Sequence, residues 1–279
     1  MHAMQNPLTT LFSSLVARAA IDPPPTSLPL FLDGRQCGWV AADVPDLFTN
    51  EPGLLARHPS GWSLVACDGD MNAGIAQLAR RLHESGRLRS WRGELLDVTD
   101  LRGAVIGVIE RSAVRPLGIA TRAVHLNAWT PAGEMWIAQR ALDKSTDPGM
   151  WDTLVGGLVS ATESDALALE RESWEEAGLP AAVLAHAVPV GEYCVRRILP
   201  EGYQAEWVGV HDVVVPPDVT PENQDGEVAQ IRAASRAEVE QMIADDAFTL
   251  EAALAIGLSF VHRGWLSAEV MAPLMRRPA

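Results

Sequence analysis

The sequence predicts an α/β (α+β) protein: an α/β/α sandwich built on a mixed sheet, preceded by a small α+β N-terminal domain. Two observations lead to this fold class. Strand-like runs lie on both sides of one acidic helix, over residues 123–141 and 187–215, and two more helices are expected at the end of the chain. The 279 residues are also enough for two hydrophobic cores. We expect the first domain to span residues 1–115 and the second to span residues 116–279.

The first domain is expected to combine short strands with helices. Residues 1–21 predict a helix that the proline cluster after Asp22 ends. Asp33-Gly34 is a turn signal between two strand-like runs, so it predicts a hairpin. Apolar residues recur at helical spacing over residues 72–83. Further strands are expected at residues 62–67, 91–98 and 105–109.

In the second domain, two long strand-like runs follow the acidic helix, over residues 187–199 and 203–215. Ser235 opens a capping box and predicts a helix that ends near Ala247. An apolar run over residues 250–263 predicts the last helix. Strands on both sides of one helix, with two helices at the end, favour a sheet covered on both faces.

The charge distribution limits the classes of substrate. The net charge of −14 argues against general nucleic-acid binding, which needs a basic surface. Residues 1–115 hold eleven arginines and twelve acidic residues, a net charge of −1, which leaves −13 for residues 116–279. An anionic substrate would therefore approach the second domain only with divalent cations between the like charges.

The cysteines and the hydropathy pattern suggest a cytoplasmic protein. Cys37, Cys67 and Cys194 are few and widely spaced, which predicts reduced thiols and no disulfide framework. No apolar run approaches the roughly 18–20 residues of a membrane span. The apolar stretch at residues 11–20 lacks a basic segment before it, so we expect a short helix there and no signal peptide.

Residues 156–179 predict a loop followed by a helix with an acidic face. Ser164 is a good N-cap residue for this helix. Glu172, Glu175 and Glu176 are spaced i, i+3, i+4, so their carboxylates project from one side. Like charges in this spacing repel, and hard oxygen ligands are what Mg²⁺ or Mn²⁺ prefers. The stretch predicts a divalent-cation site; the alternative is a solvated acidic helix face.

The same stretch resembles the Nudix box, G-x5-E-x7-R-E-U-x-E-E-x-G-U, in which U is an aliphatic residue. Every charged and glycine position is filled, from Gly157 at the start to Gly178 near the end. Ser173 departs from the pattern because it stands where an aliphatic residue is expected. We expect Ser173 to weaken the packing of the helix without removing a ligand. The resemblance implies a Nudix α/β/α sandwich and hydrolysis of a nucleoside diphosphate linked to another group, or of a similar organic diphosphate.

The resemblance also implies roles for the residues at the matching positions. Mg²⁺ or Mn²⁺ would be bound by Glu172, Glu175 and Glu176, helped by the backbone carbonyl of Gly156 or Gly157. Arg171 would orient the glutamates, and Glu163 would tie Arg171 to the loop. Phosphoryl transfer depends mostly on positioning and charge neutralisation, which such a set of groups can supply.

The general base is either a box glutamate or a residue of a later loop. Glu227 is the best later candidate, because it follows a flexible turn and precedes an apolar segment. The alternative for Glu227 is a surface carboxylate. Glu201 and Glu206 are poorer candidates, and we interpret them as strand-edge charges.

Other side chains are candidates for substrate contacts. Arg140, near the end of the strand before the motif, is expected either to contact a phosphate or to lie on the surface. Trp136, Trp151, Tyr203 and Trp207 can stack on a heteroaromatic ring, although core packing explains most such residues.

Arginines of the first domain form a separate set. Arg80, Arg81, Arg87 and Arg89 are expected to be solvated charges. The functional alternative is an arm that contacts phosphate over the neighbouring site.

Phrases outside the box extend the resemblance to a subfamily. They stand at residues 91–95, 110–112, 124–127, 148–152 and 221–228. Together they resemble Nudix proteins with an extra N-terminal domain, found alone or fused to thiamine pyrophosphokinase in fungi and similar to plant plastid Nudix enzymes. This likeness implies thiamine diphosphate, or an oxidised analogue, as the substrate and the monophosphate as the product.

Three rival functions remain open. The same box serves nucleotide-sugar and dinucleotide diphosphatases of the ADP-ribose or NADH type. Isopentenyl-diphosphate isomerase shares the fold but needs a cysteine and glutamate pair, and residues 68–193 contain no cysteine. A ligand-sensing Nudix domain without turnover usually lacks box glutamates, whereas this chain keeps them all. The expected partner is a small organic diphosphate; neither nucleic acid nor a membrane is expected, and a homodimer is compatible with the sequence.

Overall fold

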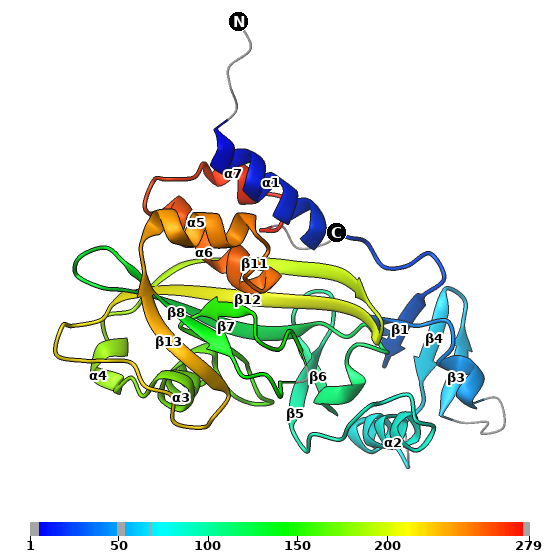
Figure 1. The fold of residues 1–279 in the computed structure, drawn as a ribbon. Coiled ribbons are helices and arrows are strands. Elements are labelled where there is room, and N and C mark those ends of the chain that lie inside the picture. Colours follow the sequence, from blue (N-terminus) through cyan, green and yellow to red (C-terminus); the bar gives the residue numbers. More distant parts are fainter. Residues whose placement is uncertain (1–5, 49–53, 67, 145, 276–279) are drawn as a thin grey trace, which may run out of the picture.

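The computed structural model describes residues 6–48, 54–66, 68–144 and 146–275, and its centre is a mixed sheet of seven strands (Figure 1). In spatial order the main strands are β11 (Val188–Leu199), β12 (Gly202–Val214), β7 (Thr121–Trp129), β8 (Met135–Arg140) and β13 (Val228–Ala234). Two short strands, β10 (Val155–Leu158) and β9 (Trp151–Thr153), pair with β7 and β8. β12 runs parallel to β7 and the other pairs of this sheet are antiparallel. The predicted mixed sheet is therefore confirmed.

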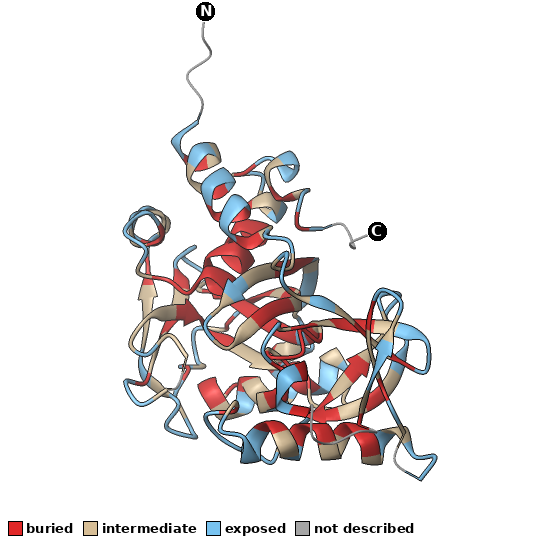
Figure 2. Ribbon diagram, turned by 90° about the vertical axis from the view of Figure 1, so that its right-hand side faces the viewer, coloured by how far each residue is buried: buried red, intermediate tan, exposed pale blue. Residues whose placement is uncertain are grey.

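Helices cover both faces of this sheet, as the predicted sandwich requires. On one face lie α3 (Asp165–Ala177) and α4 (Ala181–Leu184); on the other lie α1 (Pro7–Ala19), α5 (Arg236–Ala244), α6 (Leu250–His262) and α7 (Ala268–Met271). Neighbouring residues of β7 show why both faces are apolar: Ala123 packs in the core with α6, whereas Val124 packs in the core with α3. In Figure 2 the buried residues follow these facing surfaces, and the exposed residues follow loops and outer helix faces. Among the described residues, no helix has the length and apolar character needed to cross a bilayer.

Helix α1 comes first in the chain but packs on the C-terminal helices. The rings of Phe12 and Phe260 meet edge to face with centroids 6.0 Å apart, and Phe12 is fully buried. Gly257 lets α1 approach α6, because a Cβ atom there would lie 2.7 Å from the Phe12 ring. The helix expected at residues 1–21 is thus present as Pro7–Ala19, with residues 1–5 outside the described part. The predicted domain division at residue 115 stays a prediction.

The remaining N-terminal elements form a smaller structure, residues 28–119, which we call the N-terminal unit. It contains a four-stranded sheet of β2 (Arg35–Val40), β1 (Leu28–Leu32), β4 (Gly61–Leu64) and β3 (Leu55–His58), the helix α2 (Met71–Glu84) and a hairpin of β5 (Leu95–Thr99) and β6 (Val105–Glu110). The turn predicted at Asp33-Gly34 joins β1 to β2, and both residues have positive φ. A second hydrophobic core holds these elements together. Of the predicted thiols, Cys37 and Cys194 are buried and unpaired, and Cys67 lies outside the described residues.

The ends of α3 follow from its sequence. The Ser164 hydroxyl oxygen accepts a hydrogen bond from the Leu167 amide at 3.3 Å, and Gly178 ends the helix with φ = 60°. Ser173 is fully buried where the Nudix pattern places an aliphatic residue. Its hydroxyl has no hydrogen-bond partner among the residues that the structure describes. A buried hydroxyl without a partner costs about 1–3 kcal/mol, so Ser173 weakens α3 through an unmet hydrogen bond as well as through lost apolar contact.

Two Ser→Ala substitutions in this helix should have opposite effects on stability. Ser173→Ala removes an unpaired hydroxyl, so we expect the free energy of unfolding to rise by about 1 kcal/mol. Ser164→Ala removes the N-cap, so we expect it to fall by about 1 kcal/mol. Urea denaturation of both variants measures the two effects. A loss of stability in Ser173→Ala would show that the Ser173 hydroxyl does have a hydrogen-bond partner in the folded protein.

Candidate active site

The acidic face of α3 packs against β10 at two glycines. A Cβ atom on Gly157 would lie 2.0 Å from the carboxyl carbon of Glu172, and one on Gly156 would lie 2.8 Å from the His125 ring. The Gly156 amide also donates a hydrogen bond to Glu176 Oε2 at 2.9 Å. The lack of a side chain at Gly157 therefore lets Glu172 approach the strand, and the lack of one at Gly156 makes room for the His125 ring.

Arg171 connects the carboxylates of the motif. Its Nε and Nη2 donate to the two carboxylate oxygens of Glu163 at 3.0 and 2.9 Å, a bidentate contact. Its Nη1 lies 2.7 Å from Glu172 Oε1 and 3.2 Å from Glu175 Oε2. The hydrogen bonds from Arg171 hold the pKa of Glu163 below its usual range. Arg171 therefore ties the helix to the preceding loop and fixes the orientation of Glu172.

Glu176 is buried, and Glu172 beside it is mostly covered, with 14% of its side chain exposed. Burial raises the pKa of Glu176 to about 8, and the negative charge of Glu172 adds to the effect. Burial also raises the pKa of Glu172, although the hydrogen bond from Arg171 opposes this. Two buried carboxylates at close range repel unless protons or cations compensate them. Their oxygen atoms and their unfavourable charge fit a divalent cation such as Mg²⁺ or Mn²⁺.

Glu175, the third predicted ligand, has a different orientation. Its side chain is 43% exposed and points to Arg171, and it is not among the residues that line the adjacent cleft. Across the described residues, no group of three His, Cys, Asp or Glu side chains is arranged to hold a metal. Of the predicted metal-binding residues, the cleft is thus lined by Glu172, Glu176, Gly156 and Gly157. Glu175 lies outside the cleft, beside Arg171.

A cleft of about 430 Å³ extends from these glutamates between the large sheet and the N-terminal unit. Its walls carry many charges. The cationic side chains are Arg92, Arg111, Arg115, Arg140, Lys144 and Arg197, and the acidic ones are Asp143, Asp147, Asp152, Glu172, Glu176, Glu206, Asp225, Glu227 and Glu251. Three of the cations come from the N-terminal unit. The cleft can therefore accept an anion although the protein as a whole is acidic.

Some of the other predicted residues reach this cleft and some do not. Arg140 lines it and forms an ion pair with Asp152 at 3.2 Å. Glu227 also lines it; its carboxylate is about half exposed and paired with Lys144. Trp136 and Trp151, the tentative stacking residues, do not line the cleft.

The two tryptophans have structural positions instead. Trp136 packs against the core under α3, and Trp151 packs against the core on the opposite face. The Trp151 ring also lies under the Arg232 guanidinium, 4.7 Å from its carbon to the ring centroid. The alternation of side chains along β8 and β9 could not show on which face of the sheet each tryptophan ring would lie.

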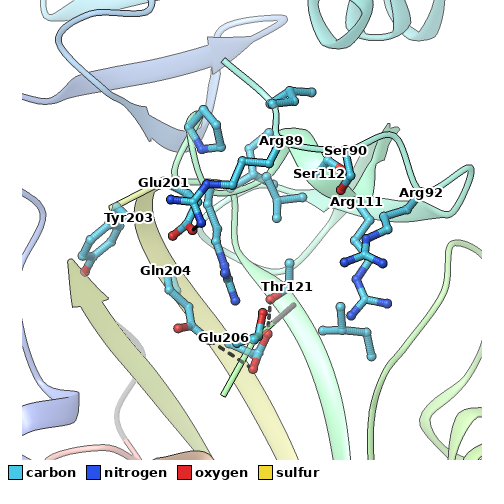
Figure 3. Close-up of a pocket in the computed structure, with 18 of the residues that line it drawn as sticks. Arg89, Ser90, Arg92, Arg111, Ser112, Thr121, Glu201, Tyr203, Gln204 and Glu206 are labelled. Carbon is cyan, nitrogen blue, oxygen red and sulfur yellow. Dashed lines mark hydrogen bonds and ion pairs between the residues drawn. The ribbon is translucent and has the colours of Figure 1, made fainter. Parts of the chain in front are cut away.

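A smaller pocket of about 150 Å³ continues from the cleft (Figure 3). Its floor contains Glu206, whose carboxylate accepts hydrogen bonds from the Thr121 hydroxyl at 2.8 Å and the Gln204 amide at 3.3 Å. Burial and the charge of Glu251 raise the pKa of Glu206. The strand-edge interpretation of Glu206 is wrong, because β12 lies between β11 and β7 in the sheet. Of the predicted stacking residues, Tyr203 lines this pocket.

The arginines expected to be solvated charges mostly lie on the surface or in ion pairs outside the cleft. Arg80 is exposed on α2, Arg81 pairs with Glu84, and Arg87 pairs with Asp43. Arg89 reaches the smaller pocket but pairs with Glu201 at 3.2 Å. The arginines of the N-terminal unit that line the same cleft as the glutamates are Arg92, Arg111 and Arg115. The sequence phrases at residues 91–95 and 110–112 contained two of them, but nothing local showed their direction.

Comparison with known proteins agrees with this geometry. The NUDIX domain model matches residues 120–254. An uncharacterized Nudix hydrolase of Streptomyces coelicolor is 31% identical over 136 residues, which cover 48% of this chain and 72% of that protein. The chain belongs to the Nudix family. The acidic helix, its glycines and Arg171 are therefore the Nudix box of this chain.

Two further relatives are similar to this chain over longer stretches. Nudix hydrolase 20, chloroplastic, of Arabidopsis thaliana is 32% identical over 183 residues, which cover 64% of this chain and 49% of that protein. An isopentenyl-diphosphate Delta-isomerase of Streptomyces coelicolor is 31% identical over 159 residues, or 56% of this chain and 78% of that protein. The chain spans about half the length of the Arabidopsis relatives that it matches.

Gly157→Ala should disturb the Nudix site with little effect elsewhere. The new methyl group would overlap the Glu172 carboxylate, so we expect Mn²⁺ affinity to fall at least about tenfold. Gly209→Ala in β12 is the matched control, because its Cβ atom would meet nothing closer than 3.9 Å. Titration with Mn²⁺ measures both affinities. Equal affinities in the two variants would contradict the close approach.

Metal-free protein should lose stability as the pH rises, because of Glu176. Its pKa is about 8 in the folded protein against 4.5 for an ordinary glutamate, so the folded state binds more protons between these values. The stabilising contribution is complete below about pH 4.5 and is lost as the pH rises through about 8. We expect Tm in EDTA to fall over this range, and less steeply in Glu176→Gln. Parallel Tm profiles for the two proteins would contradict the assignment.

Proposed function

We propose that this Nudix chain is a Mg²⁺- or Mn²⁺-dependent diphosphatase that hydrolyses the P–O–P bridge of an organic diphosphate. One observation carries the proposal: the Glu172 and Glu176 pair, little exposed to solvent, lines the same cleft as five arginines and Lys144. A diphosphate with divalent cations balances the charges of both walls. A solvated acidic helix face would not bury two of its carboxylates.

The residues of the chain have distinct roles in this reaction. Glu172 and Glu176 would hold the cations, with Glu175 joining them from its present position beside Arg171. Bound cations supply charge neutralisation and lower the pKa of water. Arg171 keeps Glu172 oriented, which reduces the reorganisation needed when substrate arrives. Glu227 accepts the proton of the attacking water, since it lines the cleft on a loop that is held to the box helix by a hydrogen bond from the Gln224 amide to the Glu175 carbonyl at 3.0 Å.

We further propose thiamine diphosphate, or an oxidised analogue, as the substrate and the monophosphate as the product. The proposal rests on the subfamily phrases, and two of these build the cleft wall: residues 91–95 contain Arg92 and residues 110–112 contain Arg111. The match to the Arabidopsis protein also covers more residues, 183, than the 135 of the NUDIX domain match. The position of Arg92 and Arg111 in the cleft supports an N-terminal unit that takes part in the function.

A nucleotide-sugar or dinucleotide diphosphatase is the second candidate, because the cleft and the smaller pocket together offer room for a larger organic group. An isomerase of the isopentenyl type is disfavoured. The described cysteines, Cys37 and Cys194, are buried and border a different pocket, together with Trp39 and Trp207. A ligand sensor is disfavoured because every box carboxylate is kept.

Hydrolysis of a panel of diphosphates, followed through the organic monophosphates that form, tests the activity. The panel holds thiamine diphosphate, its oxidised analogues, ADP-ribose and NADH, with Mg²⁺ or Mn²⁺ and identification of products by mass. We expect turnover of a thiamine compound to its monophosphate, and a loss of about a hundredfold or more in kcat for Glu175→Gln and Glu176→Gln. Glu170→Gln on the exposed side of the same helix is the matched control and should keep its activity.

The outcomes separate the candidates. Preference for ADP-ribose or NADH would keep the Nudix chemistry and exclude the thiamine assignment. Tight binding without turnover of any compound would favour the sensor. Full activity in Glu175→Gln and Glu176→Gln would exclude the catalytic assignment of the box.

A further inference from the structure

The N-terminal unit places three arginines where the cleft meets the smaller pocket. Arg92, Arg111 and Arg115 line both cavities, so they stand at the junction between them. Figure 3 shows Arg92 and Arg111 on the side of the N-terminal unit, and Thr121, Gln204 and Glu206 on the side of the large sheet. A substrate that runs from the box glutamates into the smaller pocket must pass these guanidinium groups.

The backbone that carries these arginines is firmly held. Glu110, which is 2% exposed, accepts hydrogen bonds from the amides of Arg92 and Gly93 at 2.8 and 3.1 Å. The same carboxylate accepts from the amide and the hydroxyl of Ser112 at 3.3 and 3.0 Å. One buried carboxylate therefore fastens the Arg92 loop to the turn that contains Arg111. A charge placed in this way loses little entropy when it binds an anion.

Arg115 is anchored on the other side of the junction. Its carbonyl accepts a hydrogen bond from the Tyr203 amide at 3.0 Å, at the start of β12. Gly202 beside it allows this approach, since a Cβ atom there would lie 2.1 Å from that carbonyl. The Arg115 side chain forms no ion pair or hydrogen bond with any side chain that the structure describes. Its five donors therefore remain available to a ligand.

The charges of Arg111 and Arg115 act on carboxylates of the large-sheet side of the cleft. Arg111 lowers the pKa of Glu172, and Arg115 lowers the pKa of Glu206, in both cases against the larger effect of burial. Interactions of this kind fall off with distance, so the arginines of one unit lie near the carboxylates of the other. Once divalent ions are bound at the glutamates, an anion in the cleft would have these ions on one side and the arginines on the other.

We propose that Arg92, Arg111 and Arg115 form an anion-binding subsite for the substrate phosphate that lies further from Glu172 and Glu176. The subsite rests on the proposed diphosphatase function and adds to it a substrate orientation. One phosphate lies at the box, the second lies between the arginines, and the organic group extends into the smaller pocket toward Gln204 and Glu206. The N-terminal unit is then a part of the active site and not only a neighbour of it.

Imidodiphosphate, a diphosphate analogue that resists hydrolysis, tests the subsite by titration calorimetry in the presence of Mg²⁺. We expect Arg115→Gln to weaken its binding about tenfold or more, because a charged hydrogen-bond partner is lost, and Arg115→Lys to recover part of it. Arg80→Gln removes the same charge from an exposed position of the N-terminal unit and should bind like wild type. Unchanged Tm values show that the variants are folded.

Binding and turnover distinguish this proposal from the proposed function. For any substrate that wild type hydrolyses, Arg115→Gln should raise KM about tenfold and change kcat much less. Loss of imidodiphosphate affinity in Arg115→Gln, with no hydrolysis by wild type, would support the subsite and reject the diphosphatase. Wild-type affinity and KM in Arg115→Gln, or no binding of imidodiphosphate by wild type, would overturn the subsite.

Discussion

The contact between α3 and the Gly156-Gly157 segment determines the rest of the site. Because Gly157 has no side chain, the helix can bring Glu172 against β10, and the Gly156 amide donates a hydrogen bond to Glu176. Burial raises the pKa of both carboxylates. Arg171 compensates part of this cost through its contacts with Glu163 and Glu172. The remaining repulsion is best relieved by a cation of higher charge. The fold thus creates an unfavourable pair of charges that a divalent metal makes favourable.

The motif could be predicted from sequence because its chemistry depends on local spacing. The i, i+3, i+4 glutamates, the Ser164 cap and the Gly178 stop all lie on one helix, and helix geometry alone relates them. The sandwich followed from alternating strands on both sides of that helix. The sequence could not predict the direction of the Glu175 side chain, because that direction depends on which carboxylates Arg171 contacts.

The burial and packing of some residues could not be predicted, because their contacts come from elements that are distant in the sequence. Glu206 resembles an edge charge in a sequence of alternating pattern, and only the position of β12 between two other strands buries it. Helix α1 was grouped with the elements that follow it, yet its apolar face matches α6, more than 200 residues further along the chain. Trp136 and Trp151 were candidates for stacking on a ligand, with core packing as the alternative, and the structure packs them, partly buried, against the cores on the two faces of the sheet. In each case the partner is distant in sequence.

The charge asymmetry between the two parts of the chain explains how the N-terminal unit can help to bind an anion. The cleft contains nine carboxylates and six cationic side chains, so a diphosphate would be repelled along most of its length. Divalent ions at Glu172 and Glu176 can neutralise only the end at the box. Further along, Arg140 and Arg197 are already paired with Asp152 and Glu251. Among the arginines of the N-terminal unit, Arg111 is also paired, with Glu94 at 2.7 Å. The Arg115 side chain has no ion pair or hydrogen bond with a side chain that the structure describes. In the proposed function, Arg115 therefore supplies the cleft with a positive charge that the paired arginines of the sheet do not offer to the second phosphate.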